Sequence, residues 1–194
     1  MEISVSSRQM ILAAVARAIV SRLTKQPSRP PIFPDEPALS AHAGCFVSLH
    51  RSDSHALRGC IGIVENARQL RDILIPTAES ALNDPRFAGQ PITVAEIEFL
   101  DVELTLLGPL IPAASPLHFE PQVHGIFLTA AGKSGLFLPQ VARTTGWNRE
   151  QLLDRLCYEK LGLAPKAWRF SDAFLRTFTA DIIGPAPLRL AANM

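Results

Sequence analysis

The residues with the clearest capacity for chemistry are Arg58 and Cys60, which stand two positions apart in an alternating apolar segment. On a strand, residues i and i+2 project from the same face, so the guanidinium and the thiol should lie side by side. A neighbouring cation favours the thiolate, which is the nucleophilic form of cysteine. This spacing predicts that Cys60 serves as nucleophile or ligand, with Arg58 as anion holder and thiolate stabiliser, provided that the face is open.

Two glycines, Gly59 and Gly62, interrupt the same segment. A glycine leaves the backbone unshielded, so a ligand or another chain can approach closely there. A structural interpretation stands beside this one, because cysteine is among the most buried residue types and a glycine in a strand often marks a bulge or close packing.

The remaining cysteines, Cys45 and Cys157, lie in line with apolar residues and are expected to belong to the core. Three scattered cysteines do not make a disulfide framework, and their odd number would leave one unpaired in an oxidising compartment. The sequence therefore favours the reducing cytoplasm.

Other polar residues offer weaker signals. Asp101 and Glu103 share one strand face, and such a pair can share a proton or bind a cation, although more often it faces water. Arg86 can reach over a site from an Asp-Pro-Arg-Phe turn, but a turn anchored by Phe87 explains these residues equally well.

The histidines do not form a metal-binding pattern, since they show no i, i+4 pair and no Cys-x-x-Cys companion. We therefore expect no metal and no cofactor. His50 and His55 can meet Cys60 across a hairpin, but a solvated loop position is the favoured interpretation, and a Cys60–histidine metal site is the last alternative. The five histidines are His42, His50, His55, His118 and His124.

Composition excludes several classes of function. The chain has 194 residues with 19 basic and 18 acidic side chains, a formal charge of +1 and no run of like charge, so a nucleic-acid-binding surface is not expected. The apolar stretch 10–20 is about half the length that a bilayer crossing requires and contains Arg17, so no membrane span or signal peptide is expected.

Hydrophobic periodicity predicts the order of the elements. Spacings of four predict a helix capped within 6–9 and ending near Leu23, and a second helix over 67–83 that Pro76 should kink or divide. Alternation predicts strands, and a capping asparagine with a leucine stripe predicts a late helix that Gly162 ends. The expected strands are 44–50, 57–64, 101–106, 125–129, 135–138 and 174–183, with the late helix over 148–160.

Length and element order define the expected organisation. A chain of this size forms one domain, or one domain with a small lobe, here over 1–184. Five prolines within 27–37 predict a long surface loop over 25–43, and 185–194 is expected to be a tail. Strands in hairpin-like succession with helices around them predict an α+β fold: a largely antiparallel β-sheet flanked by helices, with a smaller lobe.

The segment Leu57-Arg58-Gly59-Cys60-Ile61-Gly62 resembles the signature of the AMMECR family, whose prokaryotic members are called AmmeMemoRadiSam system protein A. Other landmarks agree with the order in that family and extend the resemblance over nearly the whole chain. These landmarks are Gly44-Cys45-Phe46-Val47-Ser48-Leu49, Asp84-Pro85-Arg86-Phe87, Val102-Glu103-Leu104-Thr105-Leu106-Leu107, His124-Gly125-Ile126, Gly135-Leu136-Phe137-Leu138-Pro139-Gln140-Val141 and Gly146-Trp147. The tail 184–194 and the proline-rich 27–37 depart from the family pattern.

The resemblance implies the same antiparallel sheet with helices and a smaller lobe, but no established reaction. By family association it implies two partners, a Memo-type protein and a radical S-adenosylmethionine enzyme, in a shared modification pathway. On this hypothesis the chain acts on a small molecule or a protein, with Glu103 and His124 as supporting acid or base groups. Gly59, Gly62 and Arg86 are the expected binding residues.

A hypothesis from another class is a non-catalytic scaffold or binding protein. Arg58 to Gly62 would then form a recognition edge, and the glycines would admit a partner's backbone.

Overall fold

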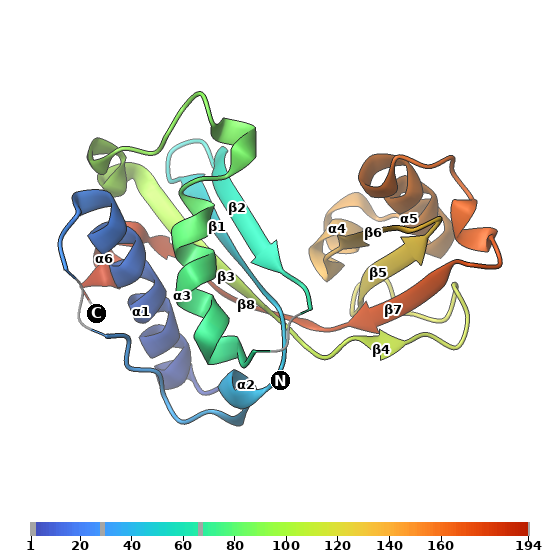
Figure 1. Cartoon of the computed structure of the whole chain (residues 1–194), viewed down its shortest axis with the longest axis horizontal. Helices are drawn as coiled ribbons and strands as arrows, with labels where there is room; N and C mark the ends of the chain where they lie inside the picture. The colour runs from blue at the N-terminus through green and yellow to red at the C-terminus, as the bar shows by residue number, and fades with distance from the viewer. Residues whose placement is uncertain (1–2, 28–29, 66–67, 194) are drawn as a thin grey trace. The chain divides into compact units, whose positions relative to one another are not determined.

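The chain is described here by a computed structural model that covers residues 3–27, 30–65 and 68–193 (Figure 1). It contains two compact units. The first is formed by Met1–Leu107 with Asp181–Met194, and the second by Gly108–Ala180. The expected smaller lobe is therefore a separate unit, inserted between two parts of the first one.

A four-stranded sheet forms the centre of the first unit. Its strands are β1 (Cys45–Arg51), β2 (Leu57–Ile63), β3 (Leu100–Leu107) and β8 (Ala180–Pro187), in the order β2-β1-β3-β8. β1 pairs antiparallel with β2 on one side and with β3 on the other. β2 is consequently an edge strand, and the expected Arg58–Gly62 segment lies on it.

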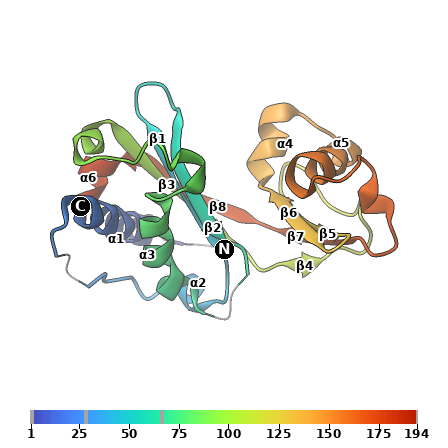
Figure 2. The ribbon, with the colours of Figure 1, turned by 45° about the horizontal axis from the view of Figure 1, so that its top comes forward.

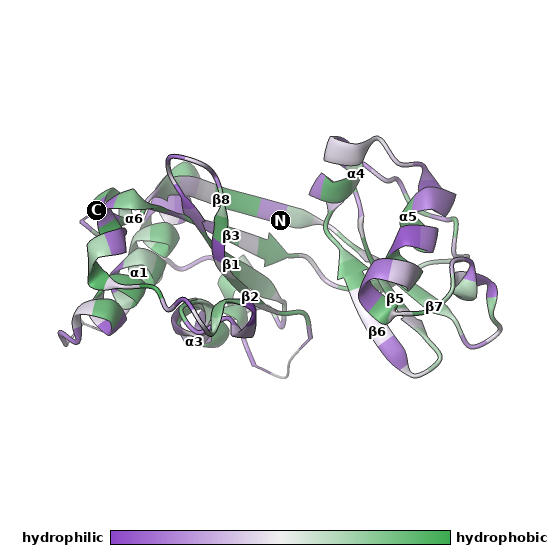
Figure 3. Cartoon of the chain, turned by 90° about the horizontal axis from the view of Figure 1, so that it is seen from above, coloured by the Kyte–Doolittle hydropathy of each residue, from purple (hydrophilic) through white to green (hydrophobic). Residues whose placement is uncertain are grey.

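Helices cover one face of this sheet. They are α1 (Val5–Thr24), α2 (Pro37–Ser40), α3 (Leu70–Ala81) and α6 (Leu188–Ala192), and Figures 2 and 3 show α1 and α3 on the same side of the strands. Val47 and Leu49 are fully buried in the core with residues of these helices. Burial of each such side chain contributes about 1.5–3 kcal/mol to folding. Between them, Ser48 points to the opposite face, where it is only partly buried.

Both predicted helices of this unit are present, but their first and last residues differ from those predicted. The cap of α1 is Ser4, whose side chain accepts a hydrogen bond from the Ser7 backbone, and Lys25 in a left-handed conformation ends the helix. Pro76 lies inside α3 without dividing it. The predicted start of that helix, Ala67, lies outside the described residues.

Two segments that the sequence analysis assigned to surface loop and tail contribute to the core. Within 25–43, α2 buries Ala38 and Leu39. At the other end, β8 runs to Pro187 and α6 buries Leu188 and Ala191. These apolar residues are too few and too close to proline for periodicity to reveal them.

The second unit has its own sheet, in the order β4-β7-β5-β6, and its own core. Its strands are β4 (Ile111–Pro112), β5 (Gly125–Ala130), β6 (Lys133–Phe137) and β7 (Phe174–Phe178), and its helices are α4 (Pro139–Thr145) and α5 (Arg149–Leu156), the latter extended by a π-helical turn (Cys157–Leu161). Ala131 and Gly132, both at positive φ, make the tight β5–β6 turn. Gly162 ends the last helical turn, as predicted.

The architecture confirms the predicted α+β class. The predicted last strand 174–183 is two strands, because β7 belongs to the second sheet and β8 to the first. Within the described residues, no helix combines the length and the apolar character that a membrane crossing demands.

Candidate functional site

Cys60 lies on the face of the first sheet that the helices leave uncovered. The β1–β2 register places it directly opposite Ser48, whose hydroxyl donates a hydrogen bond to the Cys60 sulfur at 3.2 Å. The cysteine is half-buried and forms no disulfide. The Cys60 sulfur thus has a polar partner on the strand face opposite the core.

The turn after α3 supplies two more groups at Cys60. Asp84 begins a short 3-10 turn, η1 (Pro85–Phe87), and its carboxylate accepts the Cys60 backbone N–H at 2.9 Å. Arg86 donates to the Cys60 carbonyl at 3.1 Å and to Asp84 at 2.6 Å. The outer backbone groups of the edge strand are therefore satisfied at Cys60 by the chain itself, which closes this point of the edge to an added strand.

The charges of this pair stabilise each other. Hydrogen bonds from Arg86, together with the backbone donors of Cys60 and Arg86, hold the pKa of the buried Asp84 carboxyl well below its usual range, although burial opposes the shift. The hydrogen bonds to Asp84 raise the pKa of Arg86, with a smaller contribution from the nearby Cys60 side chain. Arg86, which the sequence analysis named only as a binding residue, thus lies directly beside Cys60.

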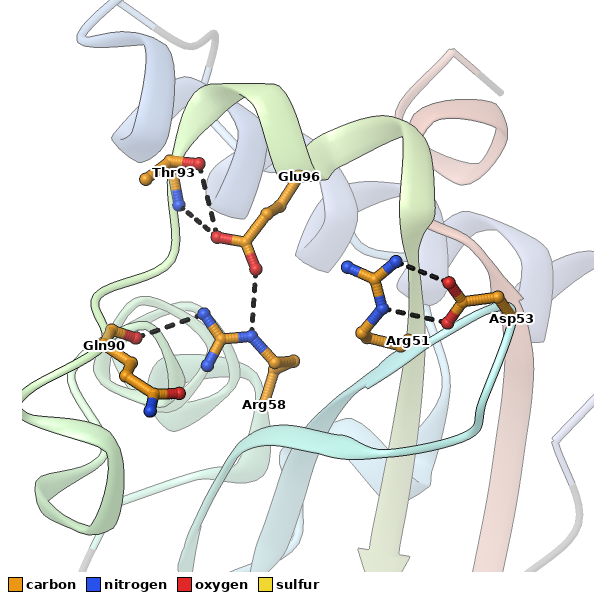
Figure 4. Close-up of polar contacts among 6 residues, drawn as sticks. All are labelled: Arg51, Asp53, Arg58, Gln90, Thr93 and Glu96. Carbon is orange, nitrogen blue, oxygen red and sulfur yellow. Dashed lines mark hydrogen bonds and ion pairs between the residues drawn. The ribbon is translucent and has the colours of Figure 1, made fainter.

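Arg58 extends to a different set of partners (Figure 4). Its Nε donates to Glu96 at 2.9 Å and its Nη2 donates to the Gln90 carbonyl at 3.1 Å. Burial acts to raise the pKa of Glu96, but the hydrogen bonds from Arg58 and Thr93 outweigh it and lower the pKa. Because the Arg58 side chain is only 12% exposed, its guanidinium is committed to holding η2 (Val94–Phe99) against the strand.

Phe87 links the two arginines. The guanidinium carbon of Arg58 lies 6.0 Å from the centre of the Phe87 ring, and that of Arg86 lies 5.8 Å from it. Cation–π attraction therefore adds to the hydrogen bonds that orient both side chains.

The glycines of the segment make close contacts within the chain. A Cβ on Gly59 would stand 2.1 Å from the carbonyl oxygen of Ala81, and one on Gly62 would stand 2.1 Å from the Phe46 ring. The sequence analysis expected this space to admit a ligand or a partner's backbone. Instead, Gly59 admits the end of α3 and Gly62 admits an aromatic ring.

The two predicted acid or base groups lie in different units. Glu103 stands opposite Ser48 on β3, so Cys60, Ser48 and Glu103 form one row across three strands. Among the described residues the Glu103 side chain has no hydrogen-bond or ion-pair partner. His124 belongs to the second unit, where its Nδ1 accepts the Glu120 backbone N–H at 3.0 Å.

The other two cysteines are core residues, as predicted. Cys45 and Cys157 are fully buried, and burial raises the pKa of the Cys45 thiol to about 11. Burial likewise raises the pKa of Cys157. Cys60 is therefore the cysteine that can meet a reagent in the folded chain.

Histidines do not join the thiol in a recognisable metal centre. His50 pairs with Leu57 in the ladder, and its Nδ1 lies 3.4 Å from the His55 carbonyl oxygen. Over the residues that the structure covers, no three side chains of the metal-ligating types (histidine, cysteine, aspartate or glutamate) converge.

Ser48 and Asp84 are the site residues that sequence reasoning missed. Ser48 carries a signal in its strand, because alternation places it on the same face as Phe46 and His50. Asp84 carries another, since aspartate before proline caps a turn. Neither signal indicates which backbone or thiol the residue will contact.

These features define an α+β protein of two units with a half-exposed thiol on the open face of one sheet. The AMMECR1 family model matches residues 13–183, and the chain belongs to this family.

Relatives in archaea match over most of the chain. Protein MJ0810 of Methanocaldococcus jannaschii is 36% identical over 146 residues, covering 72% of this chain and 71% of the relative. Protein PH0010 of Pyrococcus horikoshii is 34% identical over 183 residues, covering 90% and 87%. The crystal structure of the uncharacterized protein PH0010 is similar to this chain with a TM-score of 0.80 and 31% identity, over 94% of this chain and 93% of that one.

Proposed function

We propose that this chain acts through the thiol of Cys60, as a nucleophile or ligand, in a modification pathway of the cytoplasm. The observation that carries the proposal is the environment of the sulfur. Cys60 is half-buried, its sulfur accepts a hydrogen bond from Ser48 at 3.2 Å, and the guanidinium of Arg86 lies at its carbonyl. Hydroxyl and guanidinium groups both favour the thiolate, and exposure lets an electrophile reach it.

The roles of the surrounding residues follow from their contacts. Arg86 supplies the cation at the sulfur, and Asp84 holds that cation in place. Arg58, the cation expected from spacing, forms an ion pair with Glu96. Its effect on the reactivity of the Cys60 thiol is tested below. Glu103 stays a candidate base because its carboxylate is without a partner in the described chain and lies in the row of Cys60 and Ser48.

The partners in this proposal are a Memo-type protein and a radical S-adenosylmethionine enzyme, with a small molecule or a protein as substrate. They come from the family association given above. The cytoplasm is proposed because a half-exposed free thiol needs a reducing compartment to stay reduced.

Iodoacetamide alkylation tests the thiol role. The rate at Cys60 is measured from pH 5 to 10 in the native wild type and in Arg86→Gln and Arg58→Gln. We expect Arg86→Gln to slow the reaction at pH 7 several-fold, and Arg58→Gln to change it by less than about two-fold, because Arg86 lies at the Cys60 carbonyl whereas Arg58 is engaged by Glu96. A thiol protected until the protein unfolds would remove the nucleophile role.

A scaffold function makes a different prediction for the same site. Wild type, Cys60→Ser and Arg86→Gln are each mixed with the two purified partners, and both complex formation and product are measured. Loss of product with retained binding in Cys60→Ser supports chemistry at the thiol. Full product from Cys60→Ser would contradict it and favour a binding role.

A further inference from the structure

Arg86 has donors that its own chain does not use. A guanidinium carries five N–H groups. The Nε and Nη2 groups are directed at Asp84 and at the Cys60 carbonyl, whereas the two N–H groups of Nη1 donate to no nitrogen or oxygen of the described residues. The side chain is 58% exposed and its Nη2 lies at the Cys60 carbonyl, so these two donors are open to solvent beside Cys60.

The guanidinium of Arg86 is already oriented by its neighbours, so it forms a preorganised anion-binding site. Its carboxylate partner, Asp84, is 2% exposed and fixes one edge of the guanidinium, and the Phe87 ring lies under it. An arginine that is already oriented loses little side-chain freedom when it binds a carboxylate. The remaining donors can thus donate hydrogen bonds to a carboxylate at low entropic cost.

The two ends of the row across the sheet carry opposite charges. Arg86 lies beyond the edge strand, next come Cys60 and Ser48, and Glu103 lies at the other end. Since neighbouring strands are about 4.8 Å apart, Glu103 stands roughly 10 Å from the Cys60 backbone. Its carboxylate repels an anion at that end, and Arg86 attracts one at the thiol.

We propose that the Cys60 site takes small electrophiles that carry a carboxylate, with the carboxylate on Nη1 of Arg86 and the reacting carbon over the sulfur. This inference rests on the proposed thiol function. In the reaction, the thiol first loses its proton to solvent, and the thiolate sulfur forms a bond to carbon. The bond from that carbon to the leaving group breaks, and the leaving group departs with the electron pair.

Two reagents that differ only in charge test the inference. Iodoacetate and iodoacetamide have the same reacting carbon and both release iodide, but iodoacetate carries the carboxylate. The ratio of their rates at Cys60 is compared with the ratio for a small free thiol such as N-acetylcysteine amide. This ratio cancels the thiolate fraction, so it isolates the interaction with the carboxylate.

We expect the iodoacetate-to-iodoacetamide ratio at Cys60 to exceed that of the free thiol about five- to ten-fold, the size of one charge-assisted hydrogen bond. Added salt should reduce the excess. Arg86→Gln should return the ratio to that of the free thiol, and Arg86→Lys should retain part of it. Arg22→Gln removes an exposed charge of α1 in the same unit, on the helix side of the sheet, and should leave the ratio unchanged.

Failure of the carboxylate inference can be distinguished from failure of the proposed thiol function. A wild-type ratio equal to or below that of the free thiol overturns the carboxylate inference while leaving the thiol function intact. A native Cys60 that reacts with neither reagent overturns both proposals. The wild-type ratio needs no variant, so a misfolded Arg86→Gln protein would not prevent the decision.

Discussion

The buried carboxylate of Asp84 accepts the backbone N–H of Cys60 at 2.9 Å, although the two residues are 24 positions apart and Cys60 lies on an edge strand. An edge strand normally leaves alternate N–H and C=O groups unpaired. Here a turn from the end of α3 satisfies them with side chains. One aspartate thus fixes the strand, the turn and the arginine beside the thiol.

Asp84→Asn should lower the free energy of unfolding by about 1–3 kcal/mol, because the variant weakens hydrogen bonds to a buried charged group. Urea denaturation of both proteins measures the difference. Asp53→Asn is the matched control, since Asp53 also pairs with an arginine but is 58% exposed. An equal loss in both variants would show that the burial of Asp84 does not matter.

Acid should weaken the wild type more than Asp84→Asn. The pKa of Asp84 is lowered in the folded chain, first by the hydrogen bonds from Arg86, so the carboxylate stabilises the fold above its ordinary pKa of about 4. That stabilisation is lost as the pH falls through this range towards the lowered value. Urea midpoints from pH 6 to pH 2 should therefore converge for the two proteins, and parallel curves would contradict this linkage.

Gly59→Ala should destabilise the first unit by about 1–3 kcal/mol, because the new Cβ would stand 2.1 Å from the Ala81 carbonyl and push α3 from the strand. Gly89→Ala serves as the control. Nothing lies within 4 Å of a Cβ at Gly89, so its effect should be within about 0.5 kcal/mol. Thermal unfolding of both variants tests the contrast, and a neutral Gly59→Ala would refute the close contact.

The Arg58–Glu96 pair should show measurable coupling. Both side chains are mostly buried and lie 2.9 Å apart, so a double-mutant cycle with Arg58→Gln and Glu96→Gln should give about 1 kcal/mol. The exposed pair Arg155–Glu159 should give a smaller coupling. A coupling near zero for Arg58 and Glu96 would return Arg58 to consideration as a free cation near the thiol.

Most of the architecture was predictable because it depends on local periodicity. Alternation in β1 separated Val47 from Ser48 correctly, and the four-residue spacing of Ile11, Val15 and Ile19 predicted α1. Short apolar elements escaped this method. α6 buries Leu188 and Ala191 within five residues, too short a run for any period to be read.

The site was predictable only in part, since its decisive contacts are distant in sequence. Spacing indicated that Cys60 shares a strand face with Arg58, but Arg58 is captured by Glu96, 38 positions away. Arg86 reaches Cys60 from 26 positions away. A sequence reports which side chains are near along the chain, and the fold determines which arginine lies near the sulfur.

The most direct test of the central claim is to identify the alkylated cysteines in the native chain. The protein is treated briefly with iodoacetamide at pH 7.5, digested, and mapped by mass spectrometry. The account predicts modification of Cys60, with Cys45 and Cys157 protected until denaturant is added, because Cys60 is partly exposed and the other two cysteines are buried. A native protein in which Cys60 stays unmodified while unfolding releases all three thiols would contradict it.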